Sequence, residues 1–373
     1  MRKRKTKRGL IDLWVLVPVL LLVFIGVWLV FDASYARAAE STMTHEDAGY
    51  YAKRQFIYAL IGLVAMAVAS KVRLSTLSKL TPWMMLASIA MLVLVLVPGI
   101  GHGAKGAHRW FVLGPVSVQP SEIAKIALVM YLAEFLSRGK SVVRHVDERW
   151  ILPTLAAGAV TMLILVEPDM GTAFAVVLMC FATLFAAGVK KWQLGGLALA
   201  GSLVAWWAVK LEPYRMERIH VWLNPWEHRY DEGYQIVHSL IALGTGGLTG
   251  MGICEGREKM FTPEPHTDFV FSTLGEEFGL FVCLGLLALF VVFVYKGLNV
   301  AGRATNAYGN LLAVGITSMI GLQALTNIAV VSASIPATGV PLPFMSYGGS
   351  AMIMTLTGVG IILSISRQRP ASE

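Results

Sequence analysis

Charged residues are scarce in this sequence. Only 14% of its 373 residues are Asp, Glu, Lys or Arg, and 56% are apolar, whereas about a quarter of a soluble globular domain is charged. This composition excludes an ordinary water-soluble fold. Long apolar runs and abundant aromatic residues (16 Phe, 11 Tyr and 10 Trp) also exclude a disordered chain. The sequence therefore predicts a polytopic α-helical membrane protein.

Cysteine is almost absent, with Cys180, Cys254 and Cys283 as the three examples. They show no CxxC spacing, which argues against a disulfide framework or a thiolate metal site. The eight histidines show no HExxH or other zinc spacing, so we expect no structural metal. The net charge of +8 would suit a nucleic-acid partner, but the basic residues lie between apolar runs rather than on one face, which indicates membrane topology instead.

Ten apolar runs approach the roughly 20 residues that cross about 30 Å of hydrocarbon. They predict an all-α fold of about ten transmembrane helices. Their approximate ranges are 12–32, 54–70, 82–99, 120–137, 150–166, 171–189, 192–209, 270–295, 307–331 and 346–366. The first run follows six basic residues, and Ala36-Arg37-Ala38 resembles a signal-peptidase site, but the run exceeds a typical signal core, so we interpret it as an uncleaved span.

Lys and Arg are distributed unequally between alternate sides of these spans. With the N-terminus inside, 19 lie in inner segments and five in short outer loops, which predicts that both termini are cytoplasmic. The expected organisation is a basic N-terminus (1–11), one transmembrane domain (12–366) and a cytoplasmic tail (367–373). A large extracytoplasmic loop, 210–269, separates spans seven and eight.

Charges within apolar spans cost about 2.5 to 3.5 kcal/mol each on insertion scales, so they call for an explanation. Glu122 and Lys125 lie three residues apart at the start of the fourth span, after Arg109-Trp110. They can form an ion pair that faces the bundle, with Trp110 as an interfacial anchor. We favour the alternative, a polar substrate cavity.

Two further acidic clusters lie at the predicted outer side. Glu167-Pro168-Asp169 is interpreted mainly as a solvated turn with a helix cap. Asp268 ends the long loop between Thr267 and Phe269, where it is expected to be partly desolvated yet reachable, as suits a general base; helix capping is the alternative. Glu276 and Glu277 follow about two helical turns later, and at least one must face the protein interior.

Two segments are rich in residues that interrupt helices. The glycine run 244–252 lacks the dinucleotide fingerprint and is expected to support turns and close packing. The segment 341–350, which contains Ser346 and Ser350, leads into the last span. Irregular backbone at that depth is tolerated only beside protein or a cavity.

Five motifs in fixed order resemble one known family. They are Arg109-Trp110 with QPSEIAK, EPDMG, NPWEHRYDEGYQ, PEPHTDFVFSTLGEEFG and GVPLPFMSYGGS, spread over about 250 residues. In this order the sequence resembles the shape, elongation, division and sporulation family, of the FtsW, RodA and SpoVE type. Residues 224–235 look nearer the division and sporulation branch. Two departures, Ala351 after SYGGS and the segment 252–259, leave the branch open.

The resemblance implies a peptidoglycan glycosyltransferase that polymerises lipid II at the outer face of the bacterial cytoplasmic membrane. Asp268 matches the family's catalytic aspartate, and Arg109 and Lys125 are expected to neutralise the pyrophosphate, with a divalent cation able to share that role. The further candidate substrate-binding residues are Trp110, Glu122, His266, Glu276, Glu277, Ser346 and Ser350. The implied partners are membrane lipids and a class B penicillin-binding protein, a transpeptidase.

The chemistry agrees with this implication. A lipid pyrophosphate is already a good leaving group, so one carboxylate base plus cations suffices, unlike glycoside hydrolysis, which needs a paired acid. A lipid II transporter is the main alternative, and a non-catalytic scaffold is the third. The reactive groups collect at the predicted outer rim rather than at the midplane where transport sites usually lie, which favours the enzyme.

Overall fold

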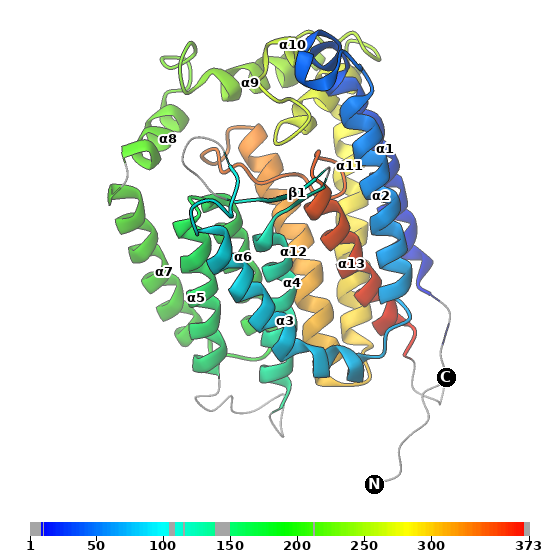
Figure 1. The fold of residues 1–373 in the computed structure, drawn as a ribbon, viewed down its shortest axis with the longest axis vertical. Helices are drawn as coiled ribbons and strands as arrows, with labels where there is room; N and C mark the ends of the chain where they lie inside the picture. The colour runs from blue at the N-terminus through cyan, green and yellow to red at the C-terminus, as the bar shows by residue number, and fades with distance from the viewer. Residues whose placement is uncertain are drawn as a thin grey trace.

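The computed structural model describes residues 9, 11–103, 109–114, 116–138, 150–211 and 213–368. Within these ranges the chain forms thirteen α-helices, one short 3-10 helix and a two-stranded hairpin (Figure 1). The helices are α1 (Leu13–Glu40), α2 (Tyr50–Ala69), α3 (Leu74–Val95), α4 (Pro120–Ser137), α5 (Ile151–Val166), α6 (Met170–Ala186), α7 (Lys191–Leu211), α8 (Pro213–Leu223), α9 (Tyr234–Gly246), α10 (Glu258–Phe261), α11 (Val270–Gly302), α12 (Ala307–Val331) and α13 (Gly349–Ser366), and η1 is Thr42–Thr44. The all-α prediction is confirmed.

Each of the ten predicted runs coincides with a helix. Seven of the helices are long and apolar enough to cross a membrane; α5 and α6 are apolar but shorter, and α4 carries three charges. How many of the ten cross stays a prediction. Sequence features set several ends: Asp12 Oδ1 accepts from the Trp14 backbone N–H (3.0 Å) at α1, and Pro120 begins α4.

Two predicted boundaries are wrong by about eight residues. α1 continues to Glu40 instead of ending at 32, because Asp32 and Ser34 are buried in contacts with the protein rather than exposed at a membrane surface. α3 begins at Leu74 instead of 82, because Leu74, Leu77 and Thr81 turn a buried face toward the bundle although the segment is too polar to register as an apolar run.

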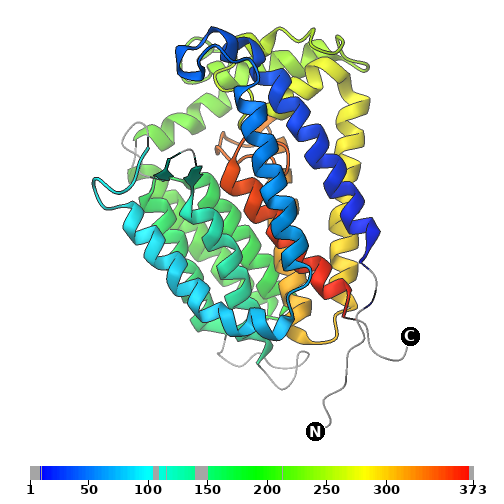
Figure 2. The ribbon, with the colours of Figure 1, turned by 45° about the vertical axis from the view of Figure 1, so that its right-hand side comes forward.

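The centre of the bundle is formed by α4, α12 and α13. Almost every residue of α4 from Pro120 to Ala133 is buried, and α12 packs on α4, α6, α11 and α13. α13 lies against α2, and α1 lies against α11 (Figure 2). α7 has no buried residue and stands at the edge of the bundle in Figure 1.

One end of the bundle is covered by α8, α9 and α10, which lie across the top in Figure 1. α9 packs along α11, and α10 contacts α1 and α11. The glycine run fits closely here: Gly250, at φ +82°, lies against α11 so that a Cβ would meet the Glu277 carbonyl oxygen at 2.1 Å. The expectation that the run supports turns and close packing is confirmed.

The segment 332–348, between α12 and α13, is not helical. α13 begins well below the upper ends of α1 and α2, so the segment lies within the height of the bundle (Figure 2). Its carbonyl oxygens accept hydrogen bonds from side chains of surrounding helices: Trp222 to Ala333, Arg218 to Ala337, Asn327 to Val340, Gln323 to Pro341 and Gln55 to Ser346. The expectation that this backbone lies beside protein is therefore confirmed.

A hairpin precedes α4, which the sequence analysis did not predict. Its strands β1 (Phe111–Leu113) and β2 (Val116–Val118) are antiparallel, with Phe111 opposite Val118 and Leu113 opposite Val116. Trp110 extends the pairing through a bridge to His102. Ser350 Oγ accepts from the Gln119 backbone N–H (3.0 Å) and donates to the Ser117 carbonyl (3.0 Å), which fixes the hairpin to the start of α13.

Candidate active site

Asp268 lies two residues before α11, where the covering loops meet the bundle. Its carbonyl oxygen accepts a hydrogen bond from Asn327 Nδ2 (2.7 Å), and the same nitrogen donates to the Val340 carbonyl (2.8 Å). Gly339, at φ +73°, lies beside the carboxylate, since a Cβ added there would be 3.5 Å from Asp268 Oδ2. The segment 339–340 therefore flanks Asp268.

Asp268 is half-buried as a residue, and its carboxylate is enclosed by protein. Burial raises its pKa from the ordinary 3.8 to about 6, and the carboxylates of Asp169 and Glu264 act in the same direction. The cations Arg218 and Arg109 oppose them. A carboxylate with this pKa is ionised at neutral pH and accepts a proton more readily than an exposed aspartate.

The 167–169 turn lies beside this carboxylate. Arg109 donates from Nε to the Glu167 carbonyl (2.9 Å) and from Nη2 to the Pro168 carbonyl. Asp169 caps α6 by accepting from the Thr172 backbone N–H (3.0 Å). The prediction of a helix cap is confirmed.

The prediction of a solvated connection at this turn is wrong for Glu167. Its side chain is fully buried, and neither carboxyl oxygen has a hydrogen-bond partner among the described residues. Burial, followed by the charge of Asp169, raises its pKa to about 8. Three residues between two apolar runs look exposed in sequence, but the turn is covered by the 338–340 segment, which Gly171 meets closely.

Glu122 and Lys125 form a buried ion pair. Their charged atoms are 2.8 Å apart, and both side chains are 3% exposed. Lys125 Nζ also contacts Gln323 Oε1 (2.8 Å), whose Nε2 donates to the Pro341 carbonyl (3.0 Å). The ion pair that faces the bundle is thus observed, and contact of either residue with substrate stays a prediction.

His266 is packed between aromatic rings. Its ring centre lies 4.3 Å from that of Tyr51 and 5.5 Å from that of Tyr347, and its carbonyl accepts from the Tyr347 backbone N–H (2.8 Å). Burial, and then the charge of Arg37, lowers its pKa to about 4. The imidazole is therefore neutral near pH 7 and joins the loop before Asp268 to α2 and to the 332–348 segment.

Glu276 and Glu277 form hydrogen bonds and an ion pair with residues 257–259 of the protein. Glu276 accepts from the backbone N–H groups of Arg257 (2.7 Å) and Glu258 (3.1 Å). Glu277 contacts Lys259 (2.6 Å), which also contacts Asp32 (2.7 Å) of α1. These carboxylates hold the 254–259 segment against α1 and α11, and their predicted role in substrate binding stays a prediction.

Ser346 is likewise engaged by the backbone. Its Oγ accepts from the Leu342 N–H (2.8 Å), so it closes a turn in the 332–348 segment, while Ser350 and Trp110 hold the hairpin as described above. Both predicted serines thus bind backbone groups of the chain, and their contact with substrate stays a prediction.

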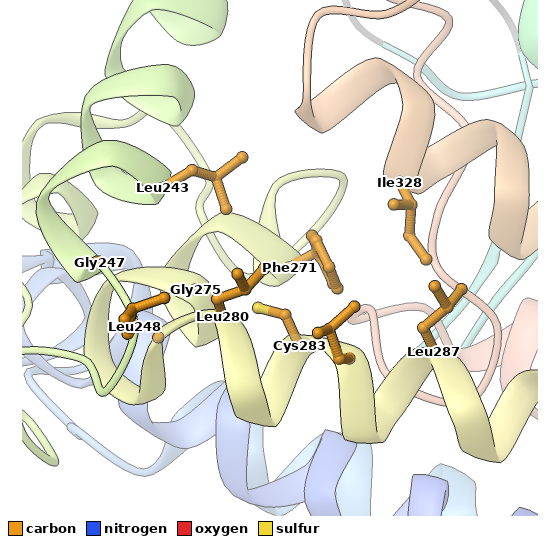
Figure 3. Close-up of a pocket in the computed structure, with 11 residues that line it drawn as sticks. Leu243, Gly247, Leu248, Phe271, Gly275, Leu280, Cys283, Leu287 and Ile328 are labelled. Carbon is orange, nitrogen blue, oxygen red and sulfur yellow. The ribbon is translucent and has the colours of Figure 1, made fainter.

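Two hollows lie outside this site. An apolar cavity of about 520 Å³ opens between α9, α11 and α12, where Leu243, Phe271, Cys283 and Ile328 point toward a common space (Figure 3). A polar depression of about 430 Å³ lies at the C-terminal end of α1, beside Asp32 and Lys259. Over the described ranges, no three His, Cys, Asp or Glu side chains are grouped so as to hold a metal ion.

Three residues near Asp268 escaped the sequence analysis: Arg218, Gln323 and Asn327. Gln323 and Asn327 share one face of α12 because they are four residues apart, and each is an amide in an otherwise apolar run. Two amides on one face of an apolar helix could have been recognised in the sequence as a polar face directed into the protein. Arg218 offered none, because nothing in the loop sequence shows that α8 reaches over the 332–348 segment.

The helical bundle, with a carboxylate and cations near one end, defines a multi-pass integral membrane protein with a polar site. Comparison with known proteins narrows this class. Residues 12–371 match the family model described as cell cycle protein, of the FtsW, RodA and SpoVE type. The chain belongs to this family and is a protein of the bacterial cytoplasmic membrane.

Curated relatives match along nearly their whole length. A probable peptidoglycan glycosyltransferase FtsW from Geobacter sp. strain M18 is 39% identical over 363 residues, covering 97% of this chain and 98% of the relative. Stage V sporulation protein E of Bacillus subtilis strain 168 is 39% identical over 364 residues, covering 97% and 98%.

Solved structures share the fold. A chain from a peptidoglycan synthase complex that coordinates polymerisation with crosslinking aligns with a TM-score of 0.79 at 29% identity, covering 97% of this chain and 99% of that one. The rod shape determining protein RodA of Thermus thermophilus aligns with a TM-score of 0.70 at 28% identity, covering 96% and 97%.

Proposed function

We propose that this protein is a peptidoglycan glycosyltransferase that polymerises lipid II, with Asp268 as the general base. One observation carries the assignment of the base: the Asp268 carboxylate is enclosed by protein within electrostatic reach of Arg109 and Arg218, on a residue that is only half-buried. The family membership and the names of the curated relatives support the reaction class.

In the proposed reaction, a sugar hydroxyl of one lipid-linked chain attacks the anomeric carbon of the sugar carried by another. A carbon–oxygen bond forms to the hydroxyl oxygen, and the bond to the lipid pyrophosphate breaks. Asp268 takes the hydroxyl proton as the new bond forms, and the pyrophosphate leaves with its electron pair. A paired acid is unnecessary because the leaving group is already anionic and stable.

The pyrophosphate needs cations. The charges of Arg109 and Arg218 both act on the Asp268 carboxylate, and we assign both to this role because guanidinium groups bind phosphate oxygens bidentately. Lys125 is neutralised by Glu122 and enclosed, so it supports the 332–348 segment unless a substrate draws it away. Among the described residues, no three His, Cys, Asp or Glu side chains are grouped so as to hold a metal ion.

The same proposal fixes the orientation. Loop 210–269, with α8, α9 and α10, faces the extracytoplasmic side, where lipid II is polymerised, and the ends of the 12–366 domain face the cytoplasm. Gly9 and Arg367 are joined by a backbone hydrogen bond (2.8 Å), which supports placing both ends on one side.

A partner follows from the product, because glycan strands need crosslinks. The solved complex to which this fold aligns couples polymerisation with crosslinking. We propose that this chain pairs with a class B penicillin-binding protein, a transpeptidase. Copurification from native membranes in mild detergent tests this, and a complex that contains no transpeptidase would count against it.

The decisive assay is polymerisation of lipid II by purified protein in detergent micelles, alone and with its partner. Micelles enclose no second compartment, so a transporter shows no activity in them. Wild type should form glycan strands, and Asp268→Asn should form none while retaining its fold and lipid binding. Asp231→Asn, an exposed carboxylate elsewhere in the loop, is the matched control. Transport of lipid II that depends on Asp268, without polymer formation, would replace this proposal.

A further inference from the structure

We propose that Asn327 is a positioning residue for the reaction: its amide fixes the Asp268 main chain against the segment that flanks the Asp268 carboxylate. The inference rests on the proposed function. It concerns a residue of α12 that contributes no charge and is 1% exposed. Its side chain contacts the backbone of Asp268 and Val340, not the reacting groups.

The Asn327 amide bridges two segments of the chain, and we call this bridge between Asp268 and Val340 the Asn327 clamp. The two hydrogens of Asn327 Nδ2 point to two carbonyl oxygens, of Asp268 at 2.7 Å and of Val340 at 2.8 Å. Both neighbours can only accept, so the nitrogen and not the oxygen of the amide must face them. Without this donor, two buried carbonyl oxygens would approach one another with no hydrogen between them, which favours their separation.

The Asn327 clamp affects the Asp268 carboxylate by positioning the neighbouring residues 339 and 340. Val340 follows Gly339, which lies against Asp268 Oδ2. The distance between residues 268 and 340 therefore sets the space around the base. Asp268 also lies at the junction of the covering loop and α11, two residues before the helix begins. A displacement of about 1 Å at a reacting group can cost about a hundredfold in rate.

A purely structural amide would behave differently. Asn327 Oδ1 is buried with no hydrogen-bond partner among the described residues, and an unsatisfied buried acceptor costs stability. An apolar side chain of similar size would avoid that cost. Replacement loses two hydrogen bonds to carbonyl oxygens but also removes the unpaired Oδ1, so the two effects on folding partly offset each other, and the larger loss should appear in turnover.

The test compares Asn327→Leu and Asn327→Ala with wild type in the micelle assay. Leucine keeps the branched shape of the side chain, and alanine removes it without adding a charge; both lose the donor. The matched control is Asn310→Leu, because Asn310 lies on the same helix and donates to a backbone carbonyl, that of Ala301 (2.8 Å), at the other end of the bundle. For each protein, kcat and KM for lipid II and the thermal midpoint are measured.

The expected result is a fall in kcat of about 10- to 100-fold for both Asn327 variants, with KM within about threefold and a thermal midpoint no lower than that of the control. Three outcomes overturn the inference: unchanged kcat, a rise in KM alone, or a loss of rate that only follows a loss of folded protein. A folded wild type that makes no polymer overturns the proposed function and this inference together.

Discussion

The protonation of Asp268 should set the lower limb of the pH–rate profile. Because its pKa is about 6, roughly half of the carboxylate is ionised at pH 6, about one-tenth at pH 5 and about nine-tenths at pH 7. A general base works only when ionised. The polymerisation rate should therefore rise about tenfold between pH 5 and pH 7 and then level off.

Two substitutions of neighbouring charges should move this midpoint in opposite directions. Asp169 raises the Asp268 pKa, and Arg218 lowers it. Asp169→Asn removes a like charge while keeping an acceptor for the α6 cap, so the midpoint should move to lower pH. Arg218→Gln removes an opposite charge, so the midpoint should move to higher pH.

Initial rates with lipid II in micelles between pH 4.5 and pH 8 check this, under subsaturating substrate so that the midpoint of kcat/KM belongs to the free protein. The maximum rate is expected to change in both variants, so the prediction is tested by the midpoint of the pH–rate profile and not by the rate itself. Shifts of the same sign, or a rate that is flat from pH 5 to pH 7, would refute the assignment of Asp268 as the base and the electrostatic reasoning behind it.

Three further predictions concern stability and topology. Burial raises the pKa of Glu167 from 4.5 to about 8, so ionising this side chain opposes folding, and the protein loses stability as the pH rises through this range. Glu167→Gln should therefore raise the free energy of unfolding at pH 8.5 by up to about 4 kcal/mol but change it little at pH 5. Thermal midpoints of both proteins at the two pH values check this. Lys259→Met leaves two buried carboxylates without their cation and should cost about 3 to 5 kcal/mol, partly recovered by adding Asp32→Asn, in denaturation assays. The topology is tested by single cysteines in a Cys254→Ser background. Tyr230→Cys, at a position that is 78% exposed, should react with an impermeant thiol reagent on intact cells, and Arg303→Cys should not. Reaction of Arg303→Cys but not of Tyr230→Cys would show the opposite orientation in the membrane.

The places and order of ten apolar helices could be read from the sequence because burial in a membrane demands long apolar runs, whereas α8, α9 and α10 within 210–269 were not predicted. The boundaries failed where polar residues face the protein instead of water. Asp32 ends the apolar run of α1, yet α1 continues because Lys259, more than 200 residues later, neutralises that carboxylate. No local pattern can reveal such a partner.

The site was predicted unevenly for the same reason. Asp268 stood out because a carboxylate at the start of an apolar run is costly unless it has a task. Glu167 looked like part of an exposed turn, and only the packing of residues 338–340 against that turn shows that it is buried. Asn327 was passed over because an amide carries no charge, although its contacts make it the residue that joins α12 to Asp268.

The non-helical segment 332–348 carries a consequence for how this sequence can change over time. Several of its contacts with surrounding helices run through carbonyl oxygens, which every amino acid possesses. These contacts do not depend on which side chains the segment carries, whereas a change at the donors Gln55, Gln323 or Asn327 leaves a carbonyl oxygen of the segment without its hydrogen bond. Among descendants of this chain, substitutions at these three donors should occur together with insertions, deletions or proline changes in 332–348, and seldom alone.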